Sequence, residues 1–171
     1  PKPVLKTLLA KHRAAHYVIA ALIGASGVLC FAPFEFFWLA PAVWLGLFVL
    51  LRSADSAKQA ALTGLSFGLG FFLTGVSWVY VSLSVFGGMP WWLAGVAAFL
   101  FCSVMALFPS LAGWIFKRWQ PAAYWRQALL FAVLIAAVDW LRSWIFTGFP
   151  WLAVGYSQAP PSPLAGFAPL F

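Results

Sequence analysis

Charge is scarce in this sequence, and acidic residues are the scarcest. Only 8% of the 171 residues are charged, with ten Lys or Arg and three Asp or Glu, for a net charge of +7. Soluble domains carry about 25% charged residues. The composition therefore excludes an ordinary soluble domain. The basic residues occur in short clusters between apolar runs and form no amphipathic face or recognition motif, so the positive net charge does not indicate nucleic-acid binding.

Residues that could act as nucleophiles or metal ligands are also few. Cys30 and Cys102 lie in apolar runs without CxxC or Cys/His spacing, and we interpret them as small buried hydrophobic residues. His12 and His16 have the i,i+4 spacing of a metal pair but no third ligand nearby, so we interpret them as interfacial polar residues. No Ser/His/Asp arrangement and no phosphate-binding loop with its Lys is recognisable. We expect no catalytic residue, metal site or cofactor in this chain.

What the chain has in excess is apolar sequence. It is 64% hydrophobic and 19% aromatic, and its mean hydropathy is +0.96. A helical membrane span needs about 20 mainly apolar residues. Five segments approach this length, and the second is the shortest and contains Pro41. They are 15–31, 36–51, 59–83, 91–116 and 125–146.

We therefore predict an all-α fold, a polytopic transmembrane helix bundle with about five spans. The first span follows basic residues as a signal peptide would, but it leads into Phe31-Ala-Pro-Phe34 and not into a small-residue cleavage site, so we expect it to be retained. Residues 147–171 contain five prolines, which a regular helix does not tolerate. We expect a Pro/Gly-rich interfacial loop there that leads to a further span, and both chain ends resemble limits of a fragment.

The basic residues predict the orientation of the bundle. If the five spans alternate, nine of the ten lie on one side. The positive-inside rule then places the N-terminus in the cytoplasm. The outer side receives Glu35, the turn Ser82–Pro90 and the segment after Phe146. The tenth basic residue, Arg142, falls at the outer end of the fifth span, where topology does not explain it.

The third span contains a small-residue pattern. Gly64 and Gly68 are spaced as Gly-x-x-x-Gly, which lets two helix backbones approach closely. We interpret the pattern as a helix-packing face, with a substrate groove as the less favoured alternative.

Asp139 and Arg142 are three residues apart, so on a helix they share a face and can form an ion pair. Charges inside a span are costly and usually face the protein interior in pairs. Two interpretations stay open. The pair could be a structural element at the helix end, or Arg142 could hold an anionic phosphate or the polar backbone of the following loop.

Aromatic and Gly-rich sequence gathers on the predicted outer side. Taken singly, these Trp and Tyr residues are typical of the aromatic belts at membrane interfaces. Together with the turns that Gly and Pro permit, they indicate a pocket for lipid headgroups. The candidate substrate-binding residues are Trp78, Tyr80, Phe86, Gly87, Gly88, Asp139, Arg142, Gly148, Phe149, Pro150, Trp151 and Tyr156.

Several of these motifs, in this order, are similar to those of a known family. Phe31-Ala-Pro-Phe34, Trp78-Val-Tyr-Val-Ser82, Phe86-Gly-Gly-Met-Pro90 and Thr147-Gly-Phe-Pro-Trp-Leu152 followed by Gly155-Tyr-Ser-Gln158 resemble apolipoprotein N-acyltransferase, the last enzyme of bacterial lipoprotein maturation. The resemblance extends over essentially the whole chain. Asp139 stands where we expect Glu in the family, and Ser143 stands where we expect Gly.

The resemblance implies an inner-membrane enzyme of Gram-negative bacteria with periplasmic substrate-facing loops. Its partners would be a phospholipid acyl donor, a diacylglyceryl lipoprotein acceptor, and its own downstream nitrilase-like domain, which carries the catalytic Glu, Lys and Cys. The chain would be the N-terminal transmembrane domain, 1–171, inactive alone because that domain is absent from it. The alternatives are a transporter or channel subunit, or a non-catalytic membrane scaffold.

Overall fold

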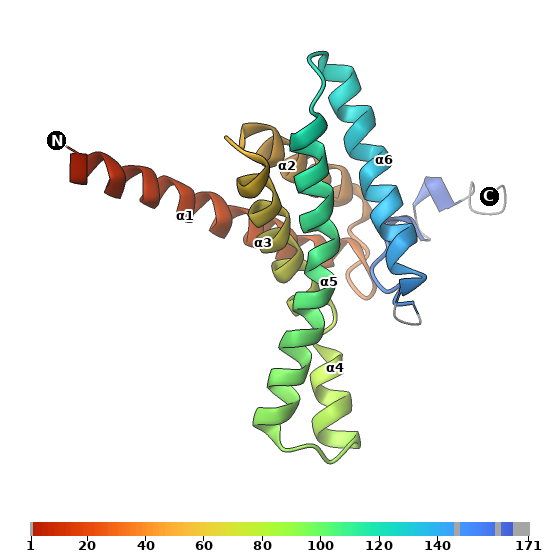
Figure 1. Ribbon diagram of the computed structural model, residues 1–171. Helices are drawn as coiled ribbons and strands as arrows, with labels where there is room; N and C mark the ends of the chain where they lie inside the picture. Colours follow the sequence, from red (N-terminus) through yellow and green to blue (C-terminus); the bar gives the residue numbers. More distant parts are fainter. Residues whose placement is uncertain (1, 146–147, 160–161, 166–171) are drawn as a thin grey trace.

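The computed structural model describes residues 2–145, 148–159 and 162–165, with side chains from Arg13 onward. In these residues the chain folds into helices joined by short turns, and no strand is present. This confirms the all-α prediction (Figure 1). The elements are α1 (Lys2–Ser26), η1 (Gly27–Cys30), η2 (Phe37–Leu39), α2 (Ala40–Ser53), α3 (Ala57–Gly75), α4 (Trp78–Val81), η3 (Ser82–Phe86), α5 (Trp91–Trp119), α6 (Tyr124–Arg142) and η5 (Val154–Gln158).

Each predicted span overlaps at least one helix among the described residues, but the helices differ in their ability to cross a membrane. Arg13–Cys30, Trp91–Trp119 and Tyr124–Arg142 are long and apolar enough individually. The third predicted span, 59–83, is not continuous, since Ala57–Gly75 and Trp78–Phe86 are bent by 51° relative to each other. The apolar helix Phe37–Ser53 is shorter. The described residues thus contain three or four candidate spans, and the count of five stays a prediction.

Helix α3 lies between α1 and α5 and packs closely against both (Figure 1). A Cβ atom added at Gly64 would overlap the backbone carbonyl of Pro109 on α5, and one added at Gly70 would overlap the carbonyl of Ala21 on α1. Only residues without a side chain permit such an approach. The Gly64 and Gly68 spacing is therefore a helix-packing face, as the sequence predicts.

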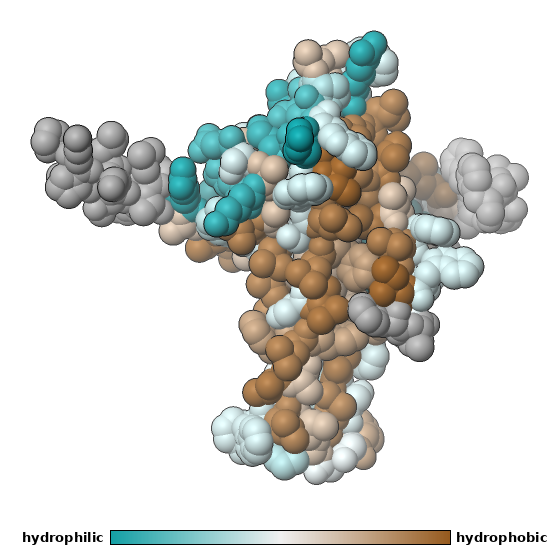
Figure 2. Space-filling model, in the orientation of Figure 1, coloured by the Kyte–Doolittle hydropathy of each residue, from teal (hydrophilic) through white to brown (hydrophobic). Residues whose placement is uncertain are grey.

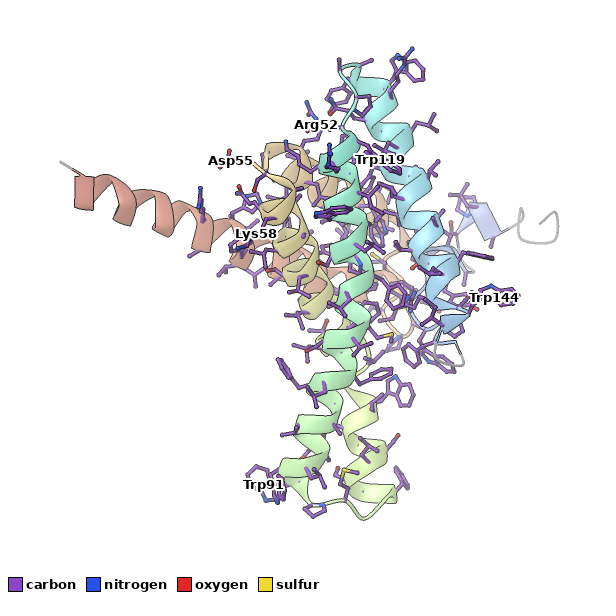
Figure 3. All side chains as sticks on the ribbon, in the orientation of Figure 1. Arg52, Asp55, Lys58, Trp91, Trp119 and Trp144 are labelled. Carbon is purple, nitrogen blue, oxygen red and sulfur yellow. The ribbon has the colours of Figure 1, made fainter. Side chains whose placement is uncertain are left out.

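The charged residues Arg52, Asp55 and Lys58 lie together where α2 connects to α3, and we call this the charged end (Figure 3). The hydrophilic surface of the molecule gathers over this region (Figure 2). Arg52 donates from Nε to Oε1 of Gln127 at 2.8 Å and lies 4.3 Å from the ring centroid of Tyr124. These contacts tie α2 to α6 and give the bundle one polar end.

Helix α5 is the long axis of the bundle. Its 29 residues correspond to about 43 Å, more than the roughly 30 Å of a bilayer's hydrocarbon core. Trp119 lies towards the charged end and Trp91 at the opposite end (Figure 3). Both are largely exposed. Tryptophan at both ends of a long apolar helix is typical of the two membrane interfaces.

The packing at Gly64 gives a stability prediction. Gly64→Ala should lower the unfolding midpoint in detergent, by the equivalent of about 1–3 kcal/mol, because the added methyl group meets rigid backbone of α5. Gly95→Ala is the matched control, since nothing lies within 4 Å of a Cβ added there. Both changes raise helix propensity equally. Equal midpoints for the two variants would contradict the close approach.

Candidate functional site

The guanidinium group of Arg142 is buried at the end of α6, with 2% of the residue exposed. Its Nη1 donates to the carbonyl oxygens of Phe149 at 2.7 Å and Trp151 at 2.5 Å. Its Nη2 donates to Oδ1 of Asp139 at 3.0 Å. The planar fork of Arg suits this simultaneous contact with two carbonyls and a carboxylate. Arg142 therefore holds the loop that follows α6.

Asp139, one helical turn earlier on α6, also binds the backbone of the loop. Its Oδ2 accepts from the backbone N–H of Val154 at 2.8 Å. The ion pair predicted from the sequence is thus present, and both partners bind backbone of the loop 148–159. These contacts agree with the part of the second interpretation in which Arg142 holds the backbone of the following loop, whereas phosphate binding stays a prediction.

The loop turns sharply at its start. Gly148 has φ +83°, and a Cβ there would overlap the carbonyl oxygen of Ser143. Phe149 then donates its N–H to the carbonyl of Arg142 at 3.0 Å. Gly fits such a position because it lacks a side chain. The turn directs Pro150 and Trp151 back towards α3, whereas Thr147 lies outside the described residues.

A cavity of about 570 Å³ opens where this loop faces the end of α3 and the segment after α1. We call it the loop cavity. It lies at the end of α3 opposite the charged end, because it includes Gly75, the last residue of α3. It is lined by Cys30, Phe31, Ala32, Glu35, Phe37, Gly75, Trp78, Pro150, Trp151, Leu152, Tyr156, Ser157 and Ala159.

Aromatic rings form much of the lining. The rings of Trp78 and Trp151 have centroids 5.9 Å apart, and Phe149 stacks on Trp151 at 5.5 Å. Phe149 in turn meets Phe101 of α5 edge to face at 4.8 Å. Such pairs add to the burial energy of the rings. The wall at Trp151 is therefore supported from behind by α5.

The predicted site residues fall into three groups. Four line the loop cavity: Trp78, Pro150, Trp151 and Tyr156. Four others position the loop: Asp139, Arg142, Gly148 and Phe149. The remaining four do not line the cavity and lie in α4, at the end of η3 or directly after it: Tyr80, Phe86, Gly87 and Gly88.

The third group belongs to a different surface. Phe86 is 84% exposed. Tyr80 lines an open groove of about 430 Å³ whose other walls come from the start of α5, including Trp91, Trp92 and Phe99. This groove is apolar apart from the polar edges of Tyr80 and the tryptophans. The structure therefore does not place all twelve predicted residues around one cavity.

Sequence reasoning left the segment after α1 out of the site. Phe31, Glu35 and Phe37 line the loop cavity, although the sequence prediction used this segment only as a motif and placed Glu35 on the outer side. Glu35 has φ +57°, uncommon for a residue with a side chain. The sequence feature that could have indicated this part of the site is Pro33 followed by a single acidic residue between aromatic residues.

The histidines take no part in this arrangement as far as the structure describes them. Nε2 of His16 lies 3.0 Å from Oγ1 of Thr63, joining α1 to α3. The side chain of His12 lies outside the description. Among its side chains the loop cavity offers the carboxylate of Glu35, the hydroxyl groups of Tyr156 and Ser157, and mainly apolar walls. Such a lining suits binding of an amphiphile.

Comparison with known proteins agrees with the motifs. Residues 23–171 match the family described as the apolipoprotein N-acyltransferase N-terminal domain. Apolipoprotein N-acyltransferase of Nitrosomonas europaea is 49% identical over 154 residues, 90% of this chain and 31% of the relative. The same-named protein of Ralstonia nicotianae is 43% identical over 158 residues, 89% of this chain and 29% of the relative.

A third relative with this name, from Vibrio vulnificus, is 41% identical over 170 residues, 93% of this chain and 31% of the relative. The chain thus spans about a third of the length of the relatives it matches. The family match covers α2 to α6 and the loop that carries Trp151, but only the end of α1. On these grounds the chain belongs to the apolipoprotein N-acyltransferase family.

Proposed function

We propose that the chain is the membrane portion of an apolipoprotein N-acyltransferase and that it forms the membrane-side floor of the enzyme's substrate site. The observation that carries the proposal is the 49% identity to a protein of this name over 90% of the chain. The loop cavity supports it, because a cavity with aromatic walls suits a lipid substrate.

The reaction proposed for the whole enzyme has two steps. A general base takes the proton of the Cys thiol, the thiolate attacks an ester carbonyl of a phospholipid, and a thioester forms as the ester C–O bond breaks; the leaving alkoxide takes up that proton and departs as the lysophospholipid. The N-terminal amine of a diacylglyceryl-Cys lipoprotein then attacks the thioester, forms the amide, loses a proton and releases the thiolate. In this proposal the Glu, Lys and Cys of the catalytic triad belong to a nitrilase-like domain outside this chain. We therefore expect this chain alone to be inactive.

The residues of this chain position substrate. Trp78, Trp151 and Tyr156 present rings to the loop cavity. Asp139 and Arg142 do not touch lipid in this proposal, but hold the backbone that carries Trp151. The apolar groove beside Tyr80 and the exposed turn at Phe86 would contact acyl chains and headgroups of approaching lipids.

We place the protein in the bacterial inner membrane, with the N-terminus and the charged end in the cytoplasm and the loop cavity at the periplasmic face. The basic residues support this orientation, because nine of ten precede or connect spans on one predicted side. The tenth, Arg142, is buried in its ion pair and gives no topology signal.

A chimera tests the function. This chain replaces the matching third of the N. europaea relative, and acyl transfer to a diacylglyceryl-Cys peptide is measured by mass spectrometry. We expect transfer by the chimera, and a loss of about tenfold or more with Trp151→Ala, since a ring of the cavity wall is removed. Trp114→Ala, which removes an exposed ring of α5 outside the cavity, is the control.

A well-folded chimera without transfer would contradict the proposed function. Solute flux through liposomes that contain the chimera would then favour the transporter alternative, and the absence of both activities would favour a scaffold. Unchanged transfer by Trp151→Ala would remove this residue from the site while leaving the family assignment intact.

Arg142 should behave as a positioning residue. Arg142→Gln leaves Asp139 without its cation and two loop carbonyls without their shared donor, so we expect the free energy of unfolding to fall by roughly 3 kcal/mol together with acyl transfer. Trp151→Ala should lower transfer alone. A variant Arg142→Gln that keeps its thermal unfolding midpoint but loses transfer would instead support direct headgroup binding.

Cysteine labelling tests the orientation. In a background lacking Cys30 and Cys102, which are both buried, Phe86→Cys should react with a membrane-impermeant maleimide added to cells with a permeabilised outer membrane. Asp55→Cys, at the exposed charged end, should react only after the inner membrane is opened. The reverse pattern would invert the topology.

A further inference from the structure

We propose that the loop cavity binds the ammonium group of an amphiphilic substrate, with the Glu35 carboxylate as its counter-ion and the neighbouring aromatic rings as its walls. This inference rests on the proposed function and adds to it a residue and a ligand chemistry. It concerns how substrate is held, and not the acyl-transfer step itself.

Glu35 supplies the only charged side chain among the residues that line the loop cavity. The two other carboxylates of the chain are engaged elsewhere: Asp139 pairs with Arg142, and Asp55 lies at the charged end. Within the described part of the chain, Asp139–Arg142 is the only ion pair. The carboxylate of Glu35 is therefore available to a cation that enters the cavity.

The backbone holds Glu35 in a defined position. Its N–H donates to the carbonyl of Phe31 and its carbonyl accepts from Phe37, at 3.0 and 2.8 Å. Gln158 of the loop donates from Nε2 to the carbonyl of Phe37 at 3.3 Å. The φ of +57° is unfavourable for Glu and is kept by these contacts. The carboxylate is thus presented on a fixed segment.

The surrounding rings select the kind of cation. The faces of Trp and Tyr rings attract organic ammonium groups, and a carboxylate in the same cavity supplies the opposite charge. Trp78, Trp151 and Tyr156 line the cavity that Glu35 lines. A divalent metal would need several oxygen ligands. Among the described residues, no group of three His, Cys, Asp or Glu side chains is placed to supply them.

The segment around Glu35 also indicates an amphiphile. Phe34, Phe36 and Trp38 flank it and are each at least 44% exposed. Exposed aromatic residues at the end of a membrane helix are typical of the interface. An amphiphile could therefore place its ammonium group in the cavity beside Glu35 and its apolar chains along the exposed aromatic residues. An amphiphile of this kind carries its charge at the headgroup level of the bilayer.

Two substrates of the proposed reaction share this chemistry. One is a phospholipid whose headgroup ends in a primary amine, and the other is the lipoprotein acceptor with its N-terminal amine. Both present a primary ammonium next to acyl chains. The experiment distinguishes them by offering each amine free or acetylated.

Binding is measured by native mass spectrometry on the chimera described above, with Glu35→Gln and Glu35→Asn as variants. Asn tolerates positive φ better than Gln. Glu35→Asn therefore removes the charge while favouring the positive φ that residue 35 adopts. The probes are phosphatidylethanolamine, its N-acetyl derivative, and a diacylglyceryl-Cys peptide with free or acetylated amine. Asp55→Asn is the matched control, an exposed carboxylate at the opposite end of α3.

We expect both Glu35 variants to weaken binding of one free-amine probe by about tenfold or more, with its acetylated form unaffected. Asp55→Asn should change nothing. The probe that responds identifies the substrate held at Glu35. Equal effects on free and acetylated probes, or no effect on either, would overturn the proposal.

The ratio of binding between the free-amine and acetylated probes also separates this inference from the proposed function. Acyl transfer by the unmutated chimera tests the function, whereas the ratio between free and acetylated probes is read without any turnover. An active chimera whose ratio does not change in the Glu35 variants would refute the ammonium site alone.

Discussion

One buried guanidinium group holds the candidate site together. Arg142 is removed from water at the end of an apolar helix, where an unpaired charge would be prohibitively costly. Asp139 and the carbonyls of Phe149 and Trp151 satisfy it. These partners are also what fix the loop over the end of α3. The requirement to satisfy a single charge therefore determines where the aromatic wall of the cavity stands.

The rest of the fold gives this arrangement a rigid base. Glycines on α3 let α1 and α5 approach until backbone meets backbone, so the three helices keep one relative position. Phe149 packs on Phe101 of α5, and Leu152 packs against Gly75 at the end of α3. The loop is consequently fastened to two helices by packing and to a third by hydrogen bonds. An irregular segment at a membrane interface needs this support, because its backbone polar groups must find partners within the protein.

The sequence was sufficient for the helices and for the pairing of Asp139 with Arg142, because hydropathy and i,i+3 spacing are local signals. It could not show the bend between Gly75 and Trp78, since the two helices together are apolar enough to pass as one span. It also grouped Phe86 with Trp151, although only Trp151 lines the loop cavity. Which aromatic residues share a cavity depends on how distant segments meet. Hydropathy does not encode that, and the same limit hid Glu35.

Glu35 and Arg142 illustrate two uses of scarce charge in a membrane protein. Arg142 has every partner within the chain and serves structure. Glu35 lines a cavity with no protein cation near it among the described residues, and its backbone conformation is unfavourable. Glu35 is exposed, but its positive φ is kept at a cost in backbone strain, and such strain is concentrated at functional sites. The same reasoning that assigns Arg142 to the scaffold therefore assigns Glu35 to a ligand.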